Sequence, residues 1–154
     1  MTLTEAERAY LETQPLGRLA TRRPDGSLQN NPVGFSYDDR TGTIQIAGRA
    51  MGASRKFHNV ADNGAVAFVV DDLVSRDPWI VRGMEIRGEA EALVEQDAGP
   101  AYASPEIIRI HPRRVISWGL GADATMQGRD VDGAAPSEED GSSPSTPPGP
   151  ITDG

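Results

Sequence analysis

The chain has 154 residues, of which 25% are charged, and a formal net charge of −8. It contains no cysteine, which excludes a disulfide framework, thiolate catalysis and a cysteine-based zinc site. No apolar run approaches the ~18 residues of a membrane span, and the acidic residues Glu5, Glu7 and Glu12 are unlike a signal peptide, so we expect a cytoplasmic protein.

The acidic charge is concentrated at the C-terminal end. Residues 121–154 contain seven of the 23 acidic residues, one of the 15 basic residues, five prolines and six glycines. Their few apolar side chains cannot offset the entropy lost on ordering, so the composition predicts one domain over residues 1–120 and a disordered tail over residues 121–154. The tail is either a solubilising extension or a partner-binding segment. The domain keeps sixteen acidic and fourteen basic residues without a broad basic face, which argues against nucleic acid as its main partner.

The first predicted elements are a short helix and a β-hairpin. Thr4 and Glu7 have the spacing of a capping box, in which Thr4 is the N-cap of the helix. Residues 16–21 and 27–37 then predict two strands, because the segment between them contains a proline and a glycine suited to a tight turn. A strand with period-two alternation follows at residues 43–47.

The only lysine of the sequence, Lys56, stands beside Arg55 in the next predicted element. A glycine-containing approach from Gly48 to Gly52 leads into a helix whose first turn holds Ser54, Arg55 and Lys56. Helix N-terminal N–H groups and the macrodipole favour an anion, and two cations add charge-assisted hydrogen bonds. The segment predicts a phosphate site for a cofactor, although an amphipathic surface helix with solvated charges explains the same spacing equally well.

The second half of the domain has the pattern of β-structure. Residues 65–70 form a continuous apolar run, which predicts a buried strand. Residues 71–78 predict a polar loop, in which Asp71 and Asp72 form a solvated turn. Residues 79–93 predict one long strand.

Two glycines and one proline interrupt this β-pattern. Gly83 and Gly88 predict bending or close backbone approach within the long strand. Short strands at residues 107–110 and 115–118 flank the pair His111 and Pro112. Six or seven closely spaced strands with one inserted helix and no βαβ rhythm predict a small antiparallel barrel.

Two segments carry a family resemblance. Residues 51–59, Met-Gly-Ala-Ser-Arg-Lys-Phe-His-Asn, and residues 107–119 are its most specific parts, and the strand Asn-Pro-Val-Gly-Phe at residues 31–35 adds to it. Over about residues 3–120, the chain resembles the pyridoxamine 5'-phosphate oxidase-like split β-barrel superfamily. Within it, the chain looks like the flavin/deazaflavin oxidoreductases that use coenzyme F420, which are abundant in actinobacteria. Residues 107–119 are similar to a branch that includes reductases of tetracycline biosynthesis.

The resemblance implies a homodimer with the cofactor in a groove between subunits. The helix at Ser54 would hold the cofactor phosphate, and the strand at residues 31–34 would run beside its ring. The residues so implied are Asn31, Pro32, Val33, Gly34, Ile46, Ala47, Ser54, Arg55, Lys56, Trp79 and Trp118. Arg22, Arg23 and Arg49 are candidate partners for the polyanionic tail of the coenzyme, or else solvated charges. No metal is implied, and His58 and His111 lie far apart in unlike contexts.

The implied activity is transfer of hydride from reduced coenzyme F420 to an activated C=C or similar bond of a small organic substrate, with a tetracycline-like polyketide as one candidate. Tyr37, Tyr102 and water remain open as the proton donor. We expect loop residues 74–79 and a second subunit to line the substrate pocket.

Two alternatives come from the same fold. The first is a flavin mononucleotide (FMN) enzyme; it is weakened because Asn31 and Ser36 stand where FMN oxidases of the superfamily place Arg and Lys. The second is a non-catalytic protein that binds a flavin or deazaflavin.

Overall fold

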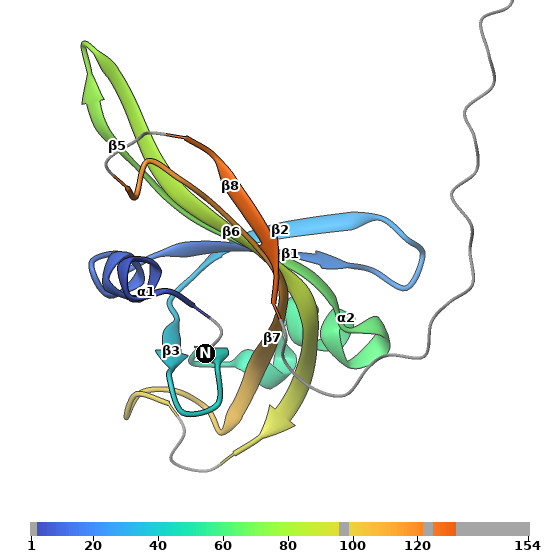
Figure 1. The fold of residues 1–154 in the computed structure, drawn as a ribbon. Helices are drawn as coiled ribbons and strands as arrows, with labels where there is room; N and C mark the ends of the chain where they lie inside the picture. Colours follow the sequence, from blue (N-terminus) through green and yellow to red (C-terminus); the bar gives the residue numbers. More distant parts are fainter. Residues whose placement is uncertain (1–2, 96–98, 122–124, 132–154) are drawn as a thin grey trace, which may run out of the picture.

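The computed structural model describes residues 3–95, 99–121 and 125–131, which form a mainly-β structure with short helices (Figure 1). The helices are α1 (Glu5–Glu12) and α2 (Arg55–Asn63), and the 3-10 turn η1 (Met51–Ala53) directly precedes α2. The strands are β1 (Gly17–Arg22), β2 (Leu28–Val33), β3 (Ser36–Asp38), β4 (Thr43–Ala47), β5 (Ala65–Arg76), β6 (Trp79–Val94), β7 (Glu106–Trp118) and β8 (Gln127–Asp130). This confirms the predicted mainly-β fold.

Every described strand pair is antiparallel. The strand order is β2-β1-β5-β6-β7-β4-β3, and β8 also pairs with β7. Figure 1 shows the β5–β6 hairpin projecting beyond the rest of the sheet, with α1 and α2 on either side of β7. Because β7 pairs with β6, β4 and β8, the sheet bends around this strand.

The core lies inside the bent sheet and follows the period of the strands. In β4, Ile44 and Ile46 are fully buried, whereas Gln45 and Ala47 between and after them are partly exposed. The Phe68 ring on β5 meets the edge of the Phe35 ring at a centroid distance of 5.1 Å. The other large, fully buried side chains are Leu3, Leu19, Met84, Ile86, Ile107, Ile108, Ile110, Val70 and Val115.

The N-terminal helix begins as predicted but is held by a contact that the sequence did not suggest. Thr4 Oγ1 accepts a hydrogen bond from the Glu7 backbone N–H at 3.2 Å. The Glu7 side chain is buried and accepts two hydrogen bonds from Arg129 on β8, one of them 2.9 Å long between Nη2 and Oε2. These bonds raise the pKa of the Arg129 guanidinium above its usual range.

Strand β8 corrects the predicted start of the tail. Disorder was predicted from residue 121, but Gln127–Asp130 pairs with β7, and Arg129 connects this strand to α1. The prediction is therefore wrong for residues 127–130, whose charges have partners in the domain. Residues 122–124 and 132–154 of the predicted tail lie outside the described residues.

The polar loop predicted at residues 71–78 is also corrected. Strand β5 continues to Arg76, and only Asp77 and Pro78 form the turn. The two aspartates stay in the strand because each has a partner on its own face: Asp71 accepts from Arg18 at 2.8 Å, and Asp72 accepts from Tyr10 at 2.6 Å and from Arg82 at 2.8 Å.

The two short strands predicted around Pro112 form a single strand, β7. Gly88 pairs with Pro112 and Arg87 with Arg114, so Arg113 is an extra residue in a β-bulge. A bulge accommodates a proline inside a strand, because the ladder hydrogen bonds are already interrupted there. The close approach predicted at Gly88 is confirmed: a Cβ there would lie 2.1 Å from the His111 carbonyl oxygen.

Neither helix in the described ranges has the length and apolar character needed to cross a membrane.

The Asp72 cluster predicts a dependence of stability on pH. The hydrogen bond from Arg82 lowers the pKa of Asp72 below its usual value of 3.8, so the stability it contributes is present above about pH 4 and is lost as the pH falls through the folded-state pKa. We expect Asp72→Asn to lower the free energy of unfolding by about 1 kcal/mol at neutral pH and to flatten its decline below pH 4, measured by urea unfolding.

The matched control is Asp71→Asn on the opposite face of the same strand, whose partner is Arg18 and whose side chain is 40% exposed. An equal loss of stability in both variants, with the same acid dependence, would contradict the role given to Asp72.

Candidate functional site

The start of α2 is fixed by a serine that uses its hydroxyl group locally. Ser54 is the N-cap: its Oγ accepts a hydrogen bond from the Phe57 N–H at 3.4 Å and donates to the Met51 carbonyl oxygen at 2.6 Å. The helix ends at Asn63, where Gly64 adopts the left-handed conformation with φ 71°. Ser54 therefore positions the first turn of the helix.

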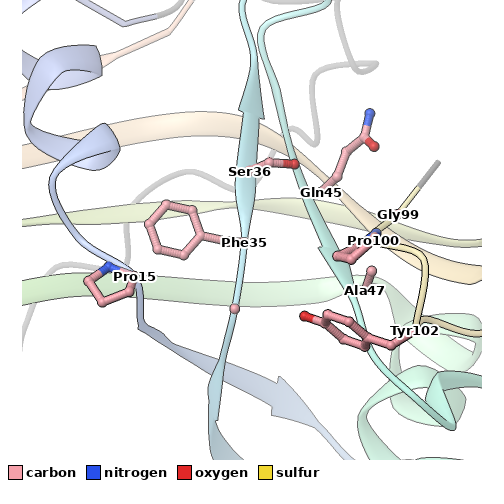
Figure 2. Close-up of a pocket in the computed structure, with 9 residues that line it drawn as sticks. Pro15, Phe35, Ser36, Gln45, Ala47, Gly99, Pro100 and Tyr102 are labelled. Atoms are coloured by element: carbon pink, nitrogen blue, oxygen red, sulfur yellow. The ribbon is translucent and has the colours of Figure 1, made fainter.

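Two pockets adjoin each other beside this turn. The first, which we call the lysine pocket, has a volume of about 240 Å³ and is lined by Pro32, Val33, Gly34, Ala47, Gly48, Arg49, Ala50, Met51 and Lys56. The second, which we call the tyrosine pocket, has a volume of about 250 Å³ and is lined by Pro15, Gly34, Phe35, Ser36, Gln45, Ala47, Gly99, Pro100 and Tyr102 (Figure 2). Both pockets are lined by Gly34 and Ala47, so they adjoin each other, and we call the two together the groove.

The groove collects five of the residues implied by the family resemblance: Pro32, Val33, Gly34, Ala47 and Lys56. They come from the end of β2, the end of β4 and the first turn of α2. Lys56 is partly buried and forms no ion pair within the described part of the chain. A partly buried cation without a counterion at one end of a groove is suited to hold an anionic group.

Two other implied residues near the groove have structural roles. The Ile46 side chain is fully buried and points away from the groove into the core. Asn31 accepts a hydrogen bond from Gln29 at 2.7 Å. They shape the strands that border the groove, and neither lines either pocket.

Arg55 and Lys56 do not act on the same surface. Consecutive residues of an α-helix point about 100° apart. Arg55 is exposed and borders two other hollows, one with Arg23 and Asp25 and one with Ala53 and His58. The predicted pair of phosphate-binding cations is thus divided, and only Lys56 lines the groove.

The two tryptophans also lie apart from the groove. Trp79 is 71% exposed and begins β6 beside the turn of the projecting hairpin (Figure 1). Trp118 ends β7 and pairs with Gly83, at the end of the β6–β7 pairing nearest this hairpin, where a Cβ on Gly83 would lie 2.7 Å from its ring. Residues 74–79, predicted to line the substrate pocket, line neither of the two pockets.

No group of three or more His, Cys, Asp or Glu residues in the described ranges is arranged to hold a metal. His111 contacts Glu91, with 2.7 Å between Nε2 and Oε2, and His58 is exposed beside Phe57.

Nine groove residues were not predicted as site residues: Pro15, Phe35, Ser36, Gln45, Gly48, Ala50, Met51, Gly99 and Pro100. Gln45 could have been predicted from the sequence, because the alternation of β4 buries Ile44 and Ile46 and leaves Gln45 on the same face as Ala47. No local pattern predicts Pro15 or Phe35 as groove residues, because their positions depend on how segments that are distant in the sequence pack together.

Comparison with known proteins places the chain in a family. Residues 3–119 match the family described as pyridoxamine 5'-phosphate oxidase. The chain belongs to this family. A 5a,11a-dehydrotetracycline/5a,11a-dehydrooxytetracycline reductase of Streptomyces rimosus is 47% identical over 135 residues, which cover 85% of this chain and 94% of the relative. The predicted resemblance to reductases of tetracycline biosynthesis is thereby confirmed.

Solved structures of the pyridoxamine 5'-phosphate oxidase fold agree with this assignment. A conserved hypothetical protein of Mycobacterium tuberculosis has a TM-score of 0.61 at 24% identity, covering 78% of this chain and 87% of that protein. An FAD binding protein of Mycobacterium smegmatis has a TM-score of 0.55 at 20% identity, covering 85% and 98%. Similarity at this level shows the fold, and the predicted split β-barrel is confirmed.

The open space beside Gly34, which lines both pockets, leads to a testable prediction. A Cβ on Gly34 would meet no atom within 4 Å, so a side chain there would project into the groove without disturbing the core. We expect Gly34→Val to leave the free energy of unfolding within about 0.5 kcal/mol of the wild-type value. Binding of coenzyme F420 or FMN, followed by ligand fluorescence, should weaken at least about tenfold because the valine occupies shared space.

Gly26→Val is the control, because it also adds a valine where a Cβ meets nothing within 4 Å, in a turn away from the groove. Its positive φ of 88° costs stability, but ligand binding should persist. Unchanged ligand affinity in Gly34→Val would show that the ligand lies elsewhere.

Proposed function

We propose that the protein is a reductase that uses coenzyme F420 to transfer hydride to an activated C=C bond of a small, tetracycline-like polyketide. The observation that carries the proposal is the distribution of charge in the groove: Arg49 and Lys56 line one end, and the described residues that line the other end are all uncharged. A cofactor with an anionic phosphate and an uncharged reacting ring, next to an uncharged acceptor, fits this distribution. The reductase name of the Streptomyces relative supports the same chemistry.

The residues present fit such a cofactor. Gly34, Ala47 and Gly48 line the groove with little or no side chain, which leaves room for a flat ring against the backbone. The ammonium group of Lys56 and the first-turn N–H groups of α2 are suited to a phosphate. When bound in its reduced form, coenzyme F420 supplies the hydride.

The contribution of the chain itself is binding and orientation. Lys56 would bind the anionic end of the cofactor, and the strand ends at Gly34 and Ala47 would border its ring. Holding ring and acceptor at a fixed separation lowers the entropic part of the barrier. Asn31 and Ser36 add no cation beside the ring, which favours F420 over FMN in this proposal.

A homodimer is part of the proposal. Four apolar side chains of the projecting hairpin are more than 40% exposed: Leu73, Val74, Trp79 and Ile80. Such a patch is typical of a surface that contacts another protein. Trp79 and Trp118 would then approach the cofactor only from a neighbouring subunit. A sedimentation mass near 16.4 kDa, that of one chain, would contradict this part of the proposal.

The binding test compares two neighbouring cations. We expect coenzyme F420 to bind the wild-type protein more tightly than FMN, and Lys56→Ala to weaken F420 binding by about 1.5–3 kcal/mol, the range for a hydrogen bond to a charged group. Arg55→Ala is the matched control and should change the affinity by no more than about 0.5 kcal/mol, because Arg55 lies outside the groove. Ligand fluorescence titration measures all three.

Tight binding of FMN with none of coenzyme F420 would contradict the proposed cofactor, and equal losses in both variants would contradict the assignment of Lys56. Turnover of reduced F420 with a panel of enones, quinones and tetracycline-like acceptors tests the reaction. Tight F420 binding without turnover on the whole panel would leave a non-catalytic binding protein as the function.

A further inference from the structure

The tyrosine pocket differs in chemistry from the lysine pocket that it adjoins. Arg49 and Lys56 line the lysine pocket, whereas every described residue lining the tyrosine pocket is uncharged. Its walls combine apolar surfaces from Pro15 and Phe35 with polar groups from other residues. None of the described lining residues offers a counterion to an ionised group, so the pocket is suited to an uncharged, largely apolar part of a ligand.

The floor of the tyrosine pocket is formed by the antiparallel pairing of β3 with β4. Ser36 on β3 is directly opposite Gln45 on β4, so their side chains lie on one face of the pair and close together. By the same alternation, Ala47 follows Gln45 on this face. Figure 2 shows the Ser36 hydroxyl directed toward the strand that carries Gln45.

Three polar groups at this pocket are free to bind a ligand. The side chains of Ser36, Gln45 and Tyr102 form no hydrogen bond with any other described residue of the chain. Together they offer two hydroxyl groups and one amide, which can both donate and accept hydrogen bonds. A ligand with several carbonyl and hydroxyl groups can use all three.

Tyr102 is held in place at the pocket. The Arg49 guanidinium lies 5.3 Å from the centre of its ring, a cation–π contact. Its segment is tied to the end of β4 through Ser104, whose N–H and hydroxyl both donate to the Gly48 carbonyl oxygen at 2.9 and 3.0 Å. Figure 2 shows the ring beside Ala47, with the hydroxyl turned toward the strand that carries Phe35.

We propose that the tyrosine pocket binds the hydride acceptor, a neutral polycyclic molecule with a carbonyl conjugated to the C=C bond that is reduced, and that the Tyr102 hydroxyl donates a hydrogen bond to that carbonyl. Ser36 and Gln45 bind oxygen substituents on the adjoining ring. The inference rests on the proposed function, which supplies hydride where the two pockets meet at Gly34 and Ala47.

The chemistry assigns Tyr102 a defined role. Hydride from the reduced cofactor adds to the β-carbon, and the electron pair of the C=C bond moves through the conjugated system to the carbonyl oxygen. The Tyr102 hydroxyl stabilises the resulting enolate by its hydrogen bond. One proton from water then adds at the α-carbon and restores the carbonyl, so the substrate gains two hydrogen atoms and the cofactor loses a hydride.

Tyr102→Phe removes only this hydroxyl and keeps the ring that Arg49 contacts. The full chain is titrated by calorimetry with 5a,11a-dehydrotetracycline, a compound in the name of the relative, and separately with coenzyme F420. We expect the dissociation constant of the tetracycline compound to rise about tenfold and kcat to fall, with the F420 affinity unchanged. Gln45→Leu should also weaken acceptor binding alone.

The matched control is Gln127→Leu, because it makes the same change as Gln45→Leu at an exposed position of β8 that lines neither pocket, and it should leave acceptor binding unchanged. Equal acceptor affinity in Tyr102→Phe and wild type would overturn the inference. So would a parallel loss of F420 binding in Tyr102→Phe, because the pocket would then hold the cofactor ring. A failure of the proposed function gives a different result, because the wild-type protein would then not bind F420. Titration with the acceptor in the absence of cofactor would still test the tyrosine pocket.

Discussion

The shape of the molecule depends on β7 pairing with three other strands. Along one edge β7 pairs with β6 from Gly83 to Val94; along the other it pairs with β4 in its first half and with β8 in its second half. A strand that exchanges partners midway must bend there. The bend is possible because Gly88 has no Cβ, which would otherwise lie 2.1 Å from the His111 carbonyl oxygen, and because Arg113 is bulged beside Pro112.

The position of the groove follows from this constraint. Pairing with the first half of β7 fixes β4, whose Ile44 and Ile46 enter the core and whose Gln45 and Ala47 consequently face outward. The chain then leaves β4 at Gly48, to which Ser104 is bonded, and turns through η1 into α2. The lysine and the tyrosine pockets are thus the two ends of the surface that β4 exposes.

Local patterns in the sequence were sufficient for elements whose stabilising contacts are close in the chain. The cap at Thr4 was of this kind. Gly34, Ala47 and Lys56, which line the groove, were named through the family resemblance of the segments that contain them. The failures at residues 71–76 and 127–130 involve distant partners. Asp72 remains in a strand because of Tyr10, and β8 is connected to α1 by the contact between Arg129 and Glu7. Nothing near these residues in the sequence distinguishes them from solvated loop residues.

The division of charge within the groove also sets the direction in which a ligand lies. An anionic group at the tyrosine pocket would meet the apolar surfaces of Pro15 and Phe35 and no cation among the described lining residues, which is unfavourable. A neutral group at the lysine pocket would leave Lys56 partly buried and unpaired. Only the orientation with the anion at Lys56 satisfies both ends. Since the two pockets share Gly34 and Ala47, the proposed function requires the uncharged part of the cofactor to meet the acceptor beside these two residues.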